Sequence, residues 1–438
     1  IGKAAMVYGK RRVGKTTLIQ KALKVSRYRT VYFECLKGTM QDNISGFVQE
    51  LVRAKILPVP LNFGALQDVF TYLNALPEKI IVVIDEYPYL KAMNDSATVD
   101  SIFQNIIDNR LANIELILSG SHIGMMKDTL QEKNALYGRF AVTIKLNELN
   151  YLEAAKFYPD KTPYDKAAHY AVFGGSPFVN QALNPAATIR ENIINTSLNP
   201  MSAVYLYASQ LLLSDYSVKI NAERIFSVIG NGKKRYTEIE DKLDVKKTGN
   251  LSKQIKSLID LEIIARNSPI NKIGDNKKST FEINDNLLRF YFTFIYKNAS
   301  ALQVLGAEAF YDEYIAPALT DFISRRFEGV CRDYFSLQVR SGKMKGVRNI
   351  GSYYYDDPIY RKNGEFDVAL EFADGYEIYE AKYYAQPMTL DEIHREVQQV
   401  EEIKELTVKQ IGFIAINGFA ERKEPYLYLD GNDIFANE

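Results

Sequence analysis

Short apolar runs alternate with amphipathic segments over the first third of the chain. The apolar runs lie at 4–8, 30–34, 80–85, 114–120 and 141–146. The helical patterns between them lie near 16–24, 41–55, 65–76 and 97–110. Apolar runs of this length are typical of strands buried on both faces, and strands that alternate with helices form a parallel sheet with right-handed crossovers. The pattern therefore predicts an α/β domain over residues 1–148.

The middle of the chain has a different pattern. Residues 149–213 are helical only, interrupted by a turn at 174–177, whereas residues 218–285 combine short Lys-rich helices with strand-like runs at 263–265 and 279–283. Helices followed by a β-hairpin are typical of a winged helix, and residues 246–261 are its candidate recognition helix. We therefore expect a helical lid followed by a winged-helix domain.

The last part of the chain returns to a mixed pattern. Residues 286–304 are aromatic and amphipathic, which indicates a packed connector. Residues 305–438 then predict a mixed α/β domain with a helix near 318–335, a hairpin over 365–382, a helix near 389–405 and a strand at 410–416. The expected fold class is thus α/β, with a parallel sheet and helical lid, a winged helix and a mixed α/β domain in that order.

Composition excludes several classes of protein. The chain has 438 residues, with 54 Lys and Arg against 54 Asp and Glu, so its net charge gives no sign of nucleic acid or membrane binding. Two distant cysteines and three histidines argue against a disulfide framework or a His-rich metal centre. No apolar run reaches the about 18 residues that span a membrane. We expect a cytoplasmic protein, and because the sequence opens at Ile1 we also expect residues upstream.

A nucleotide-binding motif follows the first predicted strand. Gly9, Gly14, Lys15 and Thr16 match G-x-x-x-x-G-K-[ST], with Thr17 next, between a strand and a helix. The glycines let backbone N–H groups surround phosphates at a helix N-terminus. Lys15 would reach the β- and γ-phosphates of ATP, and Thr16 would bind Mg²⁺.

Two further strands end in polar residues that suit such a site, and an arginine precedes a third strand. Asp85 can hold Mg²⁺ and Glu86 can polarise the attacking water, although a solvated turn gives the same pair. Ser119 and Ser121 could sense the γ-phosphate or simply satisfy a turn. Arg139 precedes the fifth strand, where it could reach the nucleotide of a neighbouring subunit or form a surface salt bridge.

These segments together resemble a known family. VYGKRRVGKTTL, VVIDEYPYL, ILSGSHIGMM, LYGRF and the GGSP turn, in this order, resemble the AAA+-related ATPases known mainly from archaea and placed near the STAND NTPases. The likeness covers about residues 1–285, including the winged helix and the tail EINDNLLRFYFTF. It implies a P-loop ATPase that uses ATP and Mg²⁺ and can form a homo-oligomer. Such proteins carry an upstream acidic-Arg-Glu motif that contacts the base, and this sequence begins after it.

A second group of candidate residues lies in the C-terminal region. Asp367 in GEFDVAL and Glu380 in YEIYEAKYY would lie on adjacent strands of a hairpin that turns at Asp374-Gly375. Residues two apart share a face of a strand, so Lys382 lies on the face of Glu380. Two carboxylates can bind Mg²⁺ or Mn²⁺, and the lysine can polarise water for attack on a phosphodiester. Glu328 on the preceding helix is the candidate extra acid.

This arrangement resembles the PD-(D/E)XK nuclease fold, which the ATPase family often carries as a C-terminal domain. The resemblance implies a metal-dependent nuclease acting on DNA or RNA. The D…E-x-K pattern is short, so a solvated hairpin or a degenerate domain that only binds remains open. The neighbouring tyrosines could stack bases or pack a core; they are Tyr353, Tyr354, Tyr355, Tyr383 and Tyr384.

The charge of the winged helix adds a further candidate surface. Residues 231–256 hold eight Lys or Arg and four Asp or Glu, which fits contacts with phosphates but also a solvated spacer. The leading hypothesis is an ATP-driven switch that controls a nuclease-like domain. The alternative is an ATPase regulator whose winged helix and degenerate C-terminal domain only bind DNA or a protein partner.

Overall fold

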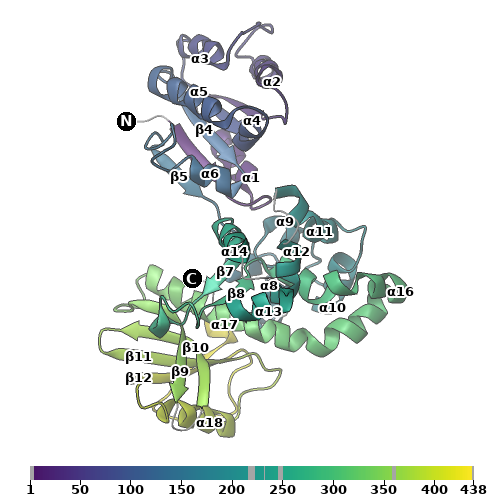
Figure 1. Cartoon of the computed structure of the whole chain (residues 1–438), viewed down its shortest axis with the longest axis vertical. Helices are drawn as coiled ribbons and strands as arrows, with labels where there is room; N and C mark the ends of the chain where they lie inside the picture. The colour runs from purple at the N-terminus through teal and green to yellow at the C-terminus, as the bar shows by residue number, and fades with distance from the viewer. Residues whose placement is uncertain (1–3, 216–221, 231, 245–249, 358–361, 437–438) are drawn as a thin grey trace. The chain divides into compact units, whose positions relative to one another are not determined.

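The computed structural model describes residues 4–215, 222–230, 232–244, 250–357 and 362–436. The chain divides into two compact units, residues 1–148 and residues 149–438. The first unit is drawn in purple to blue and the second in teal to yellow in Figure 1. None of the helices in the described ranges combines the length and the apolar content needed to cross a bilayer.

The first unit contains a five-stranded parallel sheet in the order β2-β3-β4-β1-β5. The strands are β1 (Ala4–Tyr8), β2 (Arg29–Glu34), β3 (Ile80–Asp85), β4 (Ile114–Gly120) and β5 (Val142–Lys145). The predicted α/β fold class is confirmed, but the interpretation of residues 141–146 as a buried strand is wrong. Val142 and Ile144 are 50% and 41% exposed, because β5 forms the edge of the sheet and pairs with β1 alone.

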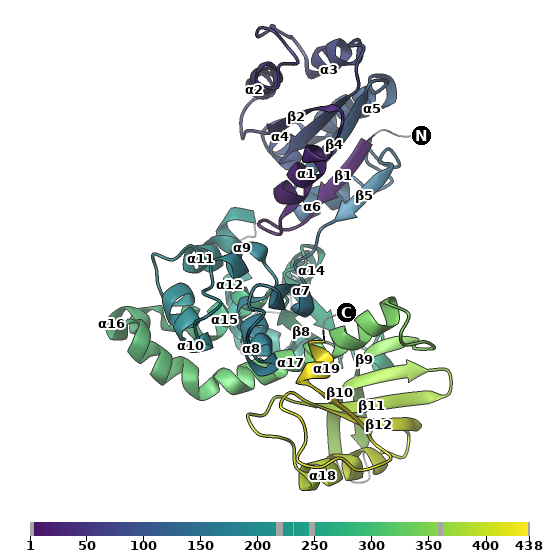
Figure 2. The same ribbon diagram turned by 180° about the vertical axis from the view of Figure 1, so that it is seen from behind.

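Helices cover both faces of this sheet. They are α1 (Lys15–Lys24), α2 (Met40–Arg53), α3 (Leu66–Asn74), α4 (Tyr87–Met93), α5 (Ser96–Asn109) and α6 (Ile123–Asp128). Ile19 of α1 packs against Val7 and Val83 on one face. Figure 2 shows α1 next to β1. The aromatic side chains of α2, α3 and α5 pack on the other face. Because the five strands are parallel, their carboxyl ends lie at one edge of the sheet.

The second unit begins with a helical region. It comprises α7 (Tyr151–Ala155), α8 (Pro163–Phe173), α9 (Pro177–Gln181), α10 (Ile189–Asn192), the π-helix η1 (Ile193–Ser197) and α11 (Ala203–Asp215). Its core is continuous with residues of α15 (Asn286–Phe290), α17 (Ala316–Arg340), and strands β10 (Lys362–Phe372) and β11 (Gly375–Lys382). The segment expected to be a lid is thus packed into one body with the C-terminal region.

Residues 222–283 form a smaller core of their own. Helices α12 (Ala222–Ile229), α13 (Tyr236–Leu243) and α14 (Asn250–Asp260) pack on a three-stranded antiparallel sheet in the order β6-β8-β7. Its strands are β6 (Lys234–Arg235), β7 (Ile264–Asn267) and β8 (Thr280–Ile283). The hairpin of β7 and β8 is where the sequence predicts it, whereas β6 is an addition. Lys246 and Lys247 of the expected recognition helix lie outside the described residues.

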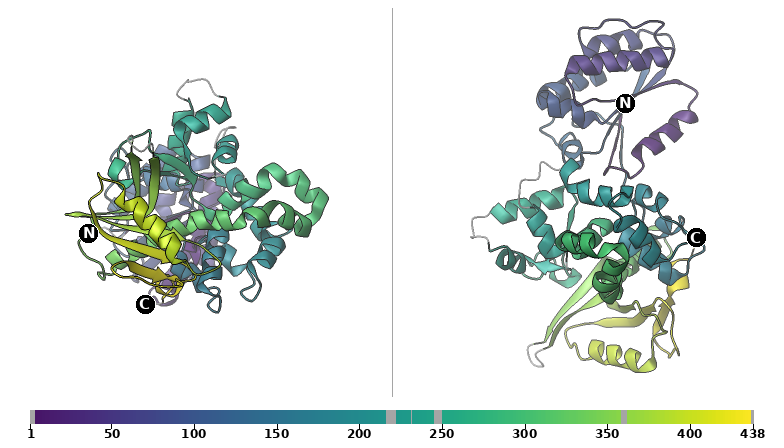
Figure 3. Two further views of the ribbon diagram at one scale, coloured as in Figure 1. Left: turned by 90° about the horizontal axis from the view of Figure 1, so that it is seen from below. Right: turned by 90° about the vertical axis from the view of Figure 1, so that its right-hand side faces the viewer.

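The C-terminal sheet has five strands in the order β13-β12-β11-β10-β9. The strands not yet named are β9 (Asn349–Asp357), β12 (Val408–Ala415) and β13 (Leu427–Asp430). Strands β9, β10 and β11 pair antiparallel, and β12 pairs parallel with β11 and β13. Helix α17 packs on one face and α18 (Leu390–Glu401) on the other, as Figure 3 shows for α18. The chain ends with α19 (Gly431–Ile434).

A run of helices joins this sheet to the region before it. After α15 come the π-helix η3 (Tyr291–Ile295), the 3₁₀ turn η4 (Tyr296–Asn298), α16 (Ala299–Phe310) and the π-helix η5 (Tyr311–Ile315), which leads into α17. A further 3₁₀ turn, η2 (Ile270–Lys272), lies between β7 and β8. The boundary expected between connector and C-terminal domain, at residues 304 and 305, therefore falls inside α16.

The peptide that leads from the first unit to the second is fixed at both ends. The Leu146 N–H donates to the Tyr8 carbonyl at 2.7 Å, and a Cβ on Gly9 would lie 2.1 Å from the Leu146 carbonyl oxygen. Three residues later the Leu149 N–H donates to the Gly175 carbonyl at 3.0 Å. Only glycine fits at position 9, where two backbone segments approach this closely.

Candidate active sites

The phosphate-binding loop lies between β1 and α1, as its motif predicts. Gly14 has φ of 97°, a left-handed conformation that favours glycine. Lys15 is buried, and its ammonium group donates to the carbonyls of Gly9 and Lys10 at 2.9 Å each. Thr17 is exposed on the first turn of α1. The loop therefore presents its backbone N–H groups, the lysine and a helix N-terminus to one place, which suits a polyphosphate.

Asp85 ends β3 beside this loop. The Thr16 hydroxyl lies 3.4 Å from Asp85 Oδ2, so the two predicted Mg²⁺ ligands are neighbours. The hydroxyl of Tyr32, on β2, also donates to Asp85 Oδ2. Burial, followed by this hydrogen bond, raises the pKa of Tyr32, so it stays a donor. A hydroxyl and a carboxylate fit the octahedral, water-rich coordination of Mg²⁺.

Glu86 is held in an unusual backbone conformation with φ of 50° and ψ of 42°. Its Oε2 accepts hydrogen bonds from the Ser121 N–H at 3.2 Å and the Ser121 hydroxyl at 2.8 Å. The Ser119 hydroxyl is fully buried and has no hydrogen-bond partner within the described part of the chain. Ser121 is thus a direct partner of Glu86, a contact that sequence spacing could not indicate.

The acidic end of the sheet also affects its neighbours. Burial, and then the charges of Asp85 and Glu86, raise the pKa of Glu34 at the end of β2. The same three causes raise the pKa of the buried thiol of Cys35, with burial again the largest. This concentration of negative charge suits a divalent cation.

Arg139 follows α6 in the segment before β5. Its guanidinium forms a two-pronged ion pair with Asp108 of α5, with contacts of 2.9 Å and 3.0 Å, and also donates to the Ala135 carbonyl at 2.7 Å. The side chains of Arg139 and Asp108 are 27% and 41% exposed. Arg139 is therefore held within its own unit but accessible from outside.

The second site lies on the C-terminal sheet. Val368 pairs with Tyr379 across β10 and β11, and the charge of the adjacent Glu380 acts on Asp367. The Lys382 ammonium donates to Glu380 Oε1 at 2.6 Å and lies 3.1 Å from Glu396 of α18. The predicted hairpin thus brings Asp367, Glu380 and Lys382 together, and Glu396 is a member that the sequence did not indicate.

Other groups approach this site from two further elements. Lys233, which precedes β6, lies 3.5 Å from Glu328 of α17 and 3.8 Å from Glu365 of β10. Arg332 of α17 donates to the Asp367 carbonyl at 2.6 Å. Glu328 therefore faces a lysine of the preceding domain as well as the carboxylates on the sheet.

The acids of this second site affect the pKa of Asp367. Burial, then the negative charges of Glu380 and Glu328, raise the pKa of Asp367 to about 8. No group of three or more His, Cys, Asp or Glu side chains in the described ranges is close enough to hold a metal ion. The paired carboxylates fit a Mg²⁺ ion that keeps several waters, which needs only one or two carboxylate ligands.

A groove of about 910 Å³ lies between α13, α14 and the β7–β8 hairpin. Four cationic side chains line it, together with Tyr236, Phe281 and a single acid, Asp260. The four cations are Arg235, Lys256, Arg266 and Lys277. Positive charge around aromatic rings is suited to a phosphate-bearing aromatic ligand.

The two parts of the chain match different families. Residues 2–179 match an ATPase domain found predominantly in Archaea. Residues 291–399 match archaeal and bacterial proteins of unknown function. The first match agrees with the loop geometry and supports an ATPase activity. The second covers Glu328, Asp367 and Lys382 without assigning them a reaction.

Individual proteins are also similar to this chain. An uncharacterized protein of Methanocaldococcus jannaschii is 28% identical over 334 residues, which is 75% of this chain and 72% of that protein. A Walker-type ATPase of Pyrococcus abyssi superposes with a TM-score of 0.50 at 19% identity, over 66% of this chain and 91% of the other. The ORC2 protein of Aeropyrum pernix, in ADPNP-ADP complexes, gives a TM-score of 0.45 at 12% identity over 67% and 87%. The P. abyssi ATPase supports the P-loop ATPase fold.

Proposed function

We propose that the protein is an ATP-hydrolysing switch that controls a metal-dependent nuclease-like domain. The observation that carries the first part is the meeting of the phosphate-binding loop with Asp85 and Glu86. Lys15 would bind the β- and γ-phosphates, and Thr16 and Asp85 would hold Mg²⁺. Glu86 would orient the attacking water, and Ser119 and Ser121 would sense the γ-phosphate.

Arg139 gives the switch a dependence on self-association. Its guanidinium is accessible, and release from Asp108 and from the carbonyls of its own turn would free it for the γ-phosphate of a neighbouring copy. An arginine supplied in this way neutralises the charge that develops in phosphoryl transfer. We therefore propose that the ATP-bound form is a homo-oligomer.

The C-terminal site would cut a phosphodiester. Asp367 and Glu380 would hold one Mg²⁺ or Mn²⁺ ion, with Glu328 as a further acid. The ion supplies a Lewis acid and a nearby hydroxide, whereas Lys382 orients the water and stabilises negative charge on the phosphate. Helices α13 and α14 with the β7–β8 hairpin would act as the winged helix, and the basic groove would bind the nucleic acid, DNA or RNA.

The deciding experiment is a cleavage assay on single- and double-stranded DNA and RNA with Mg²⁺ or Mn²⁺, with and without ATP. Wild type should cut at least one substrate, and Asp367→Asn and Lys382→Ala should each lose about 10²-fold in rate. Glu371→Gln is the matched control, because this acid lies on the same strand away from the site. Cleavage that survives both substitutions contradicts the nuclease.

The ATPase part is tested separately by calorimetry and phosphate release. Lys15→Ala should abolish ATP binding, whereas Glu86→Gln should keep binding and lose turnover. Equal ATP affinity in wild type and Lys15→Ala contradicts the proposed nucleotide site.

One observation favours a second function. Glu380 is already paired with Lys382, and no three-acid cluster is assembled in the described residues. A degenerate domain of this kind would bind nucleic acid or a protein without cutting it. Binding to the basic groove without any cleavage would identify the protein as an ATP-dependent regulator.

A further inference from the structure

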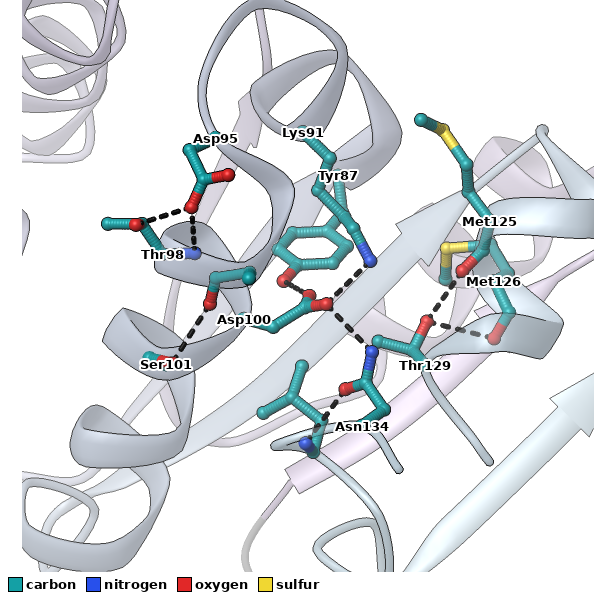
Figure 4. Close-up of polar contacts among 12 residues, drawn as sticks. Tyr87, Lys91, Asp95, Thr98, Asp100, Ser101, Met125, Met126, Thr129 and Asn134 are labelled. Carbon is teal, nitrogen blue, oxygen red and sulfur yellow. Dashed lines mark hydrogen bonds and ion pairs between the residues drawn. The ribbon is translucent and has the colours of Figure 1, made fainter. Parts of the chain in front are cut away.

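A buried carboxylate in the first unit joins three separate segments. Asp100 of α5 accepts hydrogen bonds from the Tyr87 hydroxyl at 2.5 Å, the Lys91 ammonium at 2.8 Å and the Asn134 side-chain amide at 2.8 Å. Figure 4 shows the three donors converging on it. The side chains of Lys91 and Asp100 are only 3% and 4% exposed. We refer to these four residues as the Asp100 cluster.

One side of the Asp100 cluster reaches the catalytic end of β3. Tyr87 directly follows Glu86, and its fully buried ring packs edge-on against Phe103 of α5 at 5.0 Å. The left-handed backbone of Glu86 is unfavourable for a side chain of this size, so its neighbours must hold it in place. The hydrogen bond from the Tyr87 hydroxyl to Asp100 helps to hold Glu86 in this conformation.

The same helix also contacts the phosphate-binding loop. Arg11 of the loop donates to the Tyr89 hydroxyl of α4 at 2.6 Å. Helix α4 therefore links the loop that would bind the nucleotide to Asp100. A shift of α4 when phosphates bind would act directly on Tyr87 and Lys91.

The other side of the cluster reaches the segment that carries Arg139. Asn134 accepts from the Leu136 N–H at 2.9 Å through its side chain, and its carbonyl accepts from the Tyr137 N–H at 3.1 Å. The Arg139 N–H in turn donates to the Leu136 carbonyl at 3.2 Å. Asn134 thus sets the turn from which Arg139 projects, while Asp108 on α5 holds its guanidinium.

We propose that Asp100 and Asn134 are positioning residues that couple Glu86 to Arg139. The nucleotide site of one copy then controls the position of the Arg139 side chain that this copy presents to the neighbouring copy. The inference rests on the proposed ATPase function. Burial of an ion pair in this way adds little net stability compared with apolar residues of the same shape. Its geometric effect is to fix α4 and the 134–139 turn to one point of α5.

The test uses Asn134→Ala, which removes the link to the turn but keeps the Tyr87 and Lys91 contacts. Its affinity for ATP should stay within about twofold of wild type, and its kcat should fall at least about tenfold, since small misplacements of a catalytic group cost this much. Asn62→Ala, at an exposed asparagine of the same unit, is the matched control and should hydrolyse ATP as wild type does.

A double-substitution cycle separates positioning from stability. Because Asn134 would act through Arg139, the pair Asn134→Ala and Arg139→Ala should be no slower than Arg139→Ala alone. Losses that multiply, or full activity in Asn134→Ala, overturn the inference. If Asn134→Ala does not fold, Tyr87→Phe replaces it, which removes only the hydroxyl and should show the same loss of kcat at unchanged ATP affinity.

Failure of the proposed function gives a different result. A wild-type chain without Lys15-dependent hydrolysis overturns both the ATPase and the coupling. An active wild type in which Arg139→Ala is also fully active overturns the coupling and leaves the nucleotide site intact.

Discussion

Asp367 faces two other carboxylates in the second site, so its charge is costly without a metal. Because its pKa in the folded chain is raised, the folded state binds a proton more tightly than the unfolded state. The raised pKa of Asp367 therefore contributes to the free energy of unfolding at low pH. This contribution is lost as the pH rises from about 4 to about 8.

Asp367→Asn should therefore unfold at a higher temperature than wild type at pH 8.5 in a chelator. The difference should shrink as the pH is lowered toward 5, because Asp367 is then neutral in the folded protein. Thermal melts at both pH values check it. A variant less stable than wild type at pH 8.5 would mean that the acid has a structural role.

His169 gives a pH dependence of the opposite sign. Burial in α8 lowers its pKa to about 4, and its Nδ1 lies 2.8 Å from the Asp165 carbonyl. Between about pH 6.5 and pH 4 the unfolded chain binds a proton that the folded chain does not. Acidification through this range should cost the second unit about 3 kcal/mol of stability.

Urea unfolding at pH 7 and pH 4.5 measures this loss. His169→Gln keeps hydrogen-bonding groups but cannot titrate, so its stability should fall less than that of wild type between the two pH values. An equal fall in both proteins would assign the acid sensitivity to other groups.

The sequence indicates candidate residues that lie in local motifs but not the distant residues that contact them. Lys15, Asp85 and Glu86 follow strands whose apolar runs are unmistakable. Glu396 and Ser121 contact Lys382 and Glu86 only after distant elements pack, so no spacing in the sequence reveals them. The same holds for Asp108, which is 31 positions from Arg139.

At the scale of elements, β9 forms the edge of the C-terminal sheet but is covered at one point. The Asn271 side chain donates to the Tyr354 carbonyl at 2.7 Å and accepts from the Tyr354 N–H at 3.0 Å. Lys278 donates to the Tyr354 hydroxyl at 2.7 Å. The segment between β7 and β8 is therefore docked on β9, which protects an edge that could otherwise pair with another chain.

Asn271→Ala should leave the N–H and C=O of Tyr354 unpaired and destabilise this contact by about 1–3 kcal/mol. Hydrogen exchange at Tyr354 should accelerate, and the exposed neighbour Lys272→Ala should leave it unchanged. Unaltered exchange in Asn271→Ala would show that the docking depends on apolar contacts alone.

Elements of strong periodicity were predictable, and very short elements were not. Strands β1 to β4 of the first sheet and the hairpin of β10 and β11 lie where the apolar pattern predicts them. Strand β6 has two residues and β13 has four, too short for a pattern. Residues 141–146 resemble a buried strand because four of their six side chains are apolar. Strand β5 lies at an edge of the sheet, however, and its Val142 and Ile144 are exposed.

At the scale of the whole molecule, the nucleotide site is predicted to be completed by Arg139 of a second copy. Arg139→Ala subunits bind ATP but offer no arginine, whereas Lys15→Ala subunits offer the arginine but bind no ATP. Each alone should be nearly inactive, and their mixture should recover hydrolysis. Phosphate release and light scattering with ATP measure both properties; an inactive mixture with a monomeric wild type contradicts the trans role.

The fixed peptide between the two units has a mechanical consequence. Leu146 is held beside Gly9 in the first unit and Leu149 is held at Gly175 in the second, so only two residues lie between the two fixed points. A movement of the phosphate-binding loop at Gly9 would therefore act on backbone that lies two residues before the first unit ends. A few Gly and Ser residues inserted after Asn147 would lengthen this peptide. Under the proposed function, the first unit should then still bind ATP but should no longer affect the second unit.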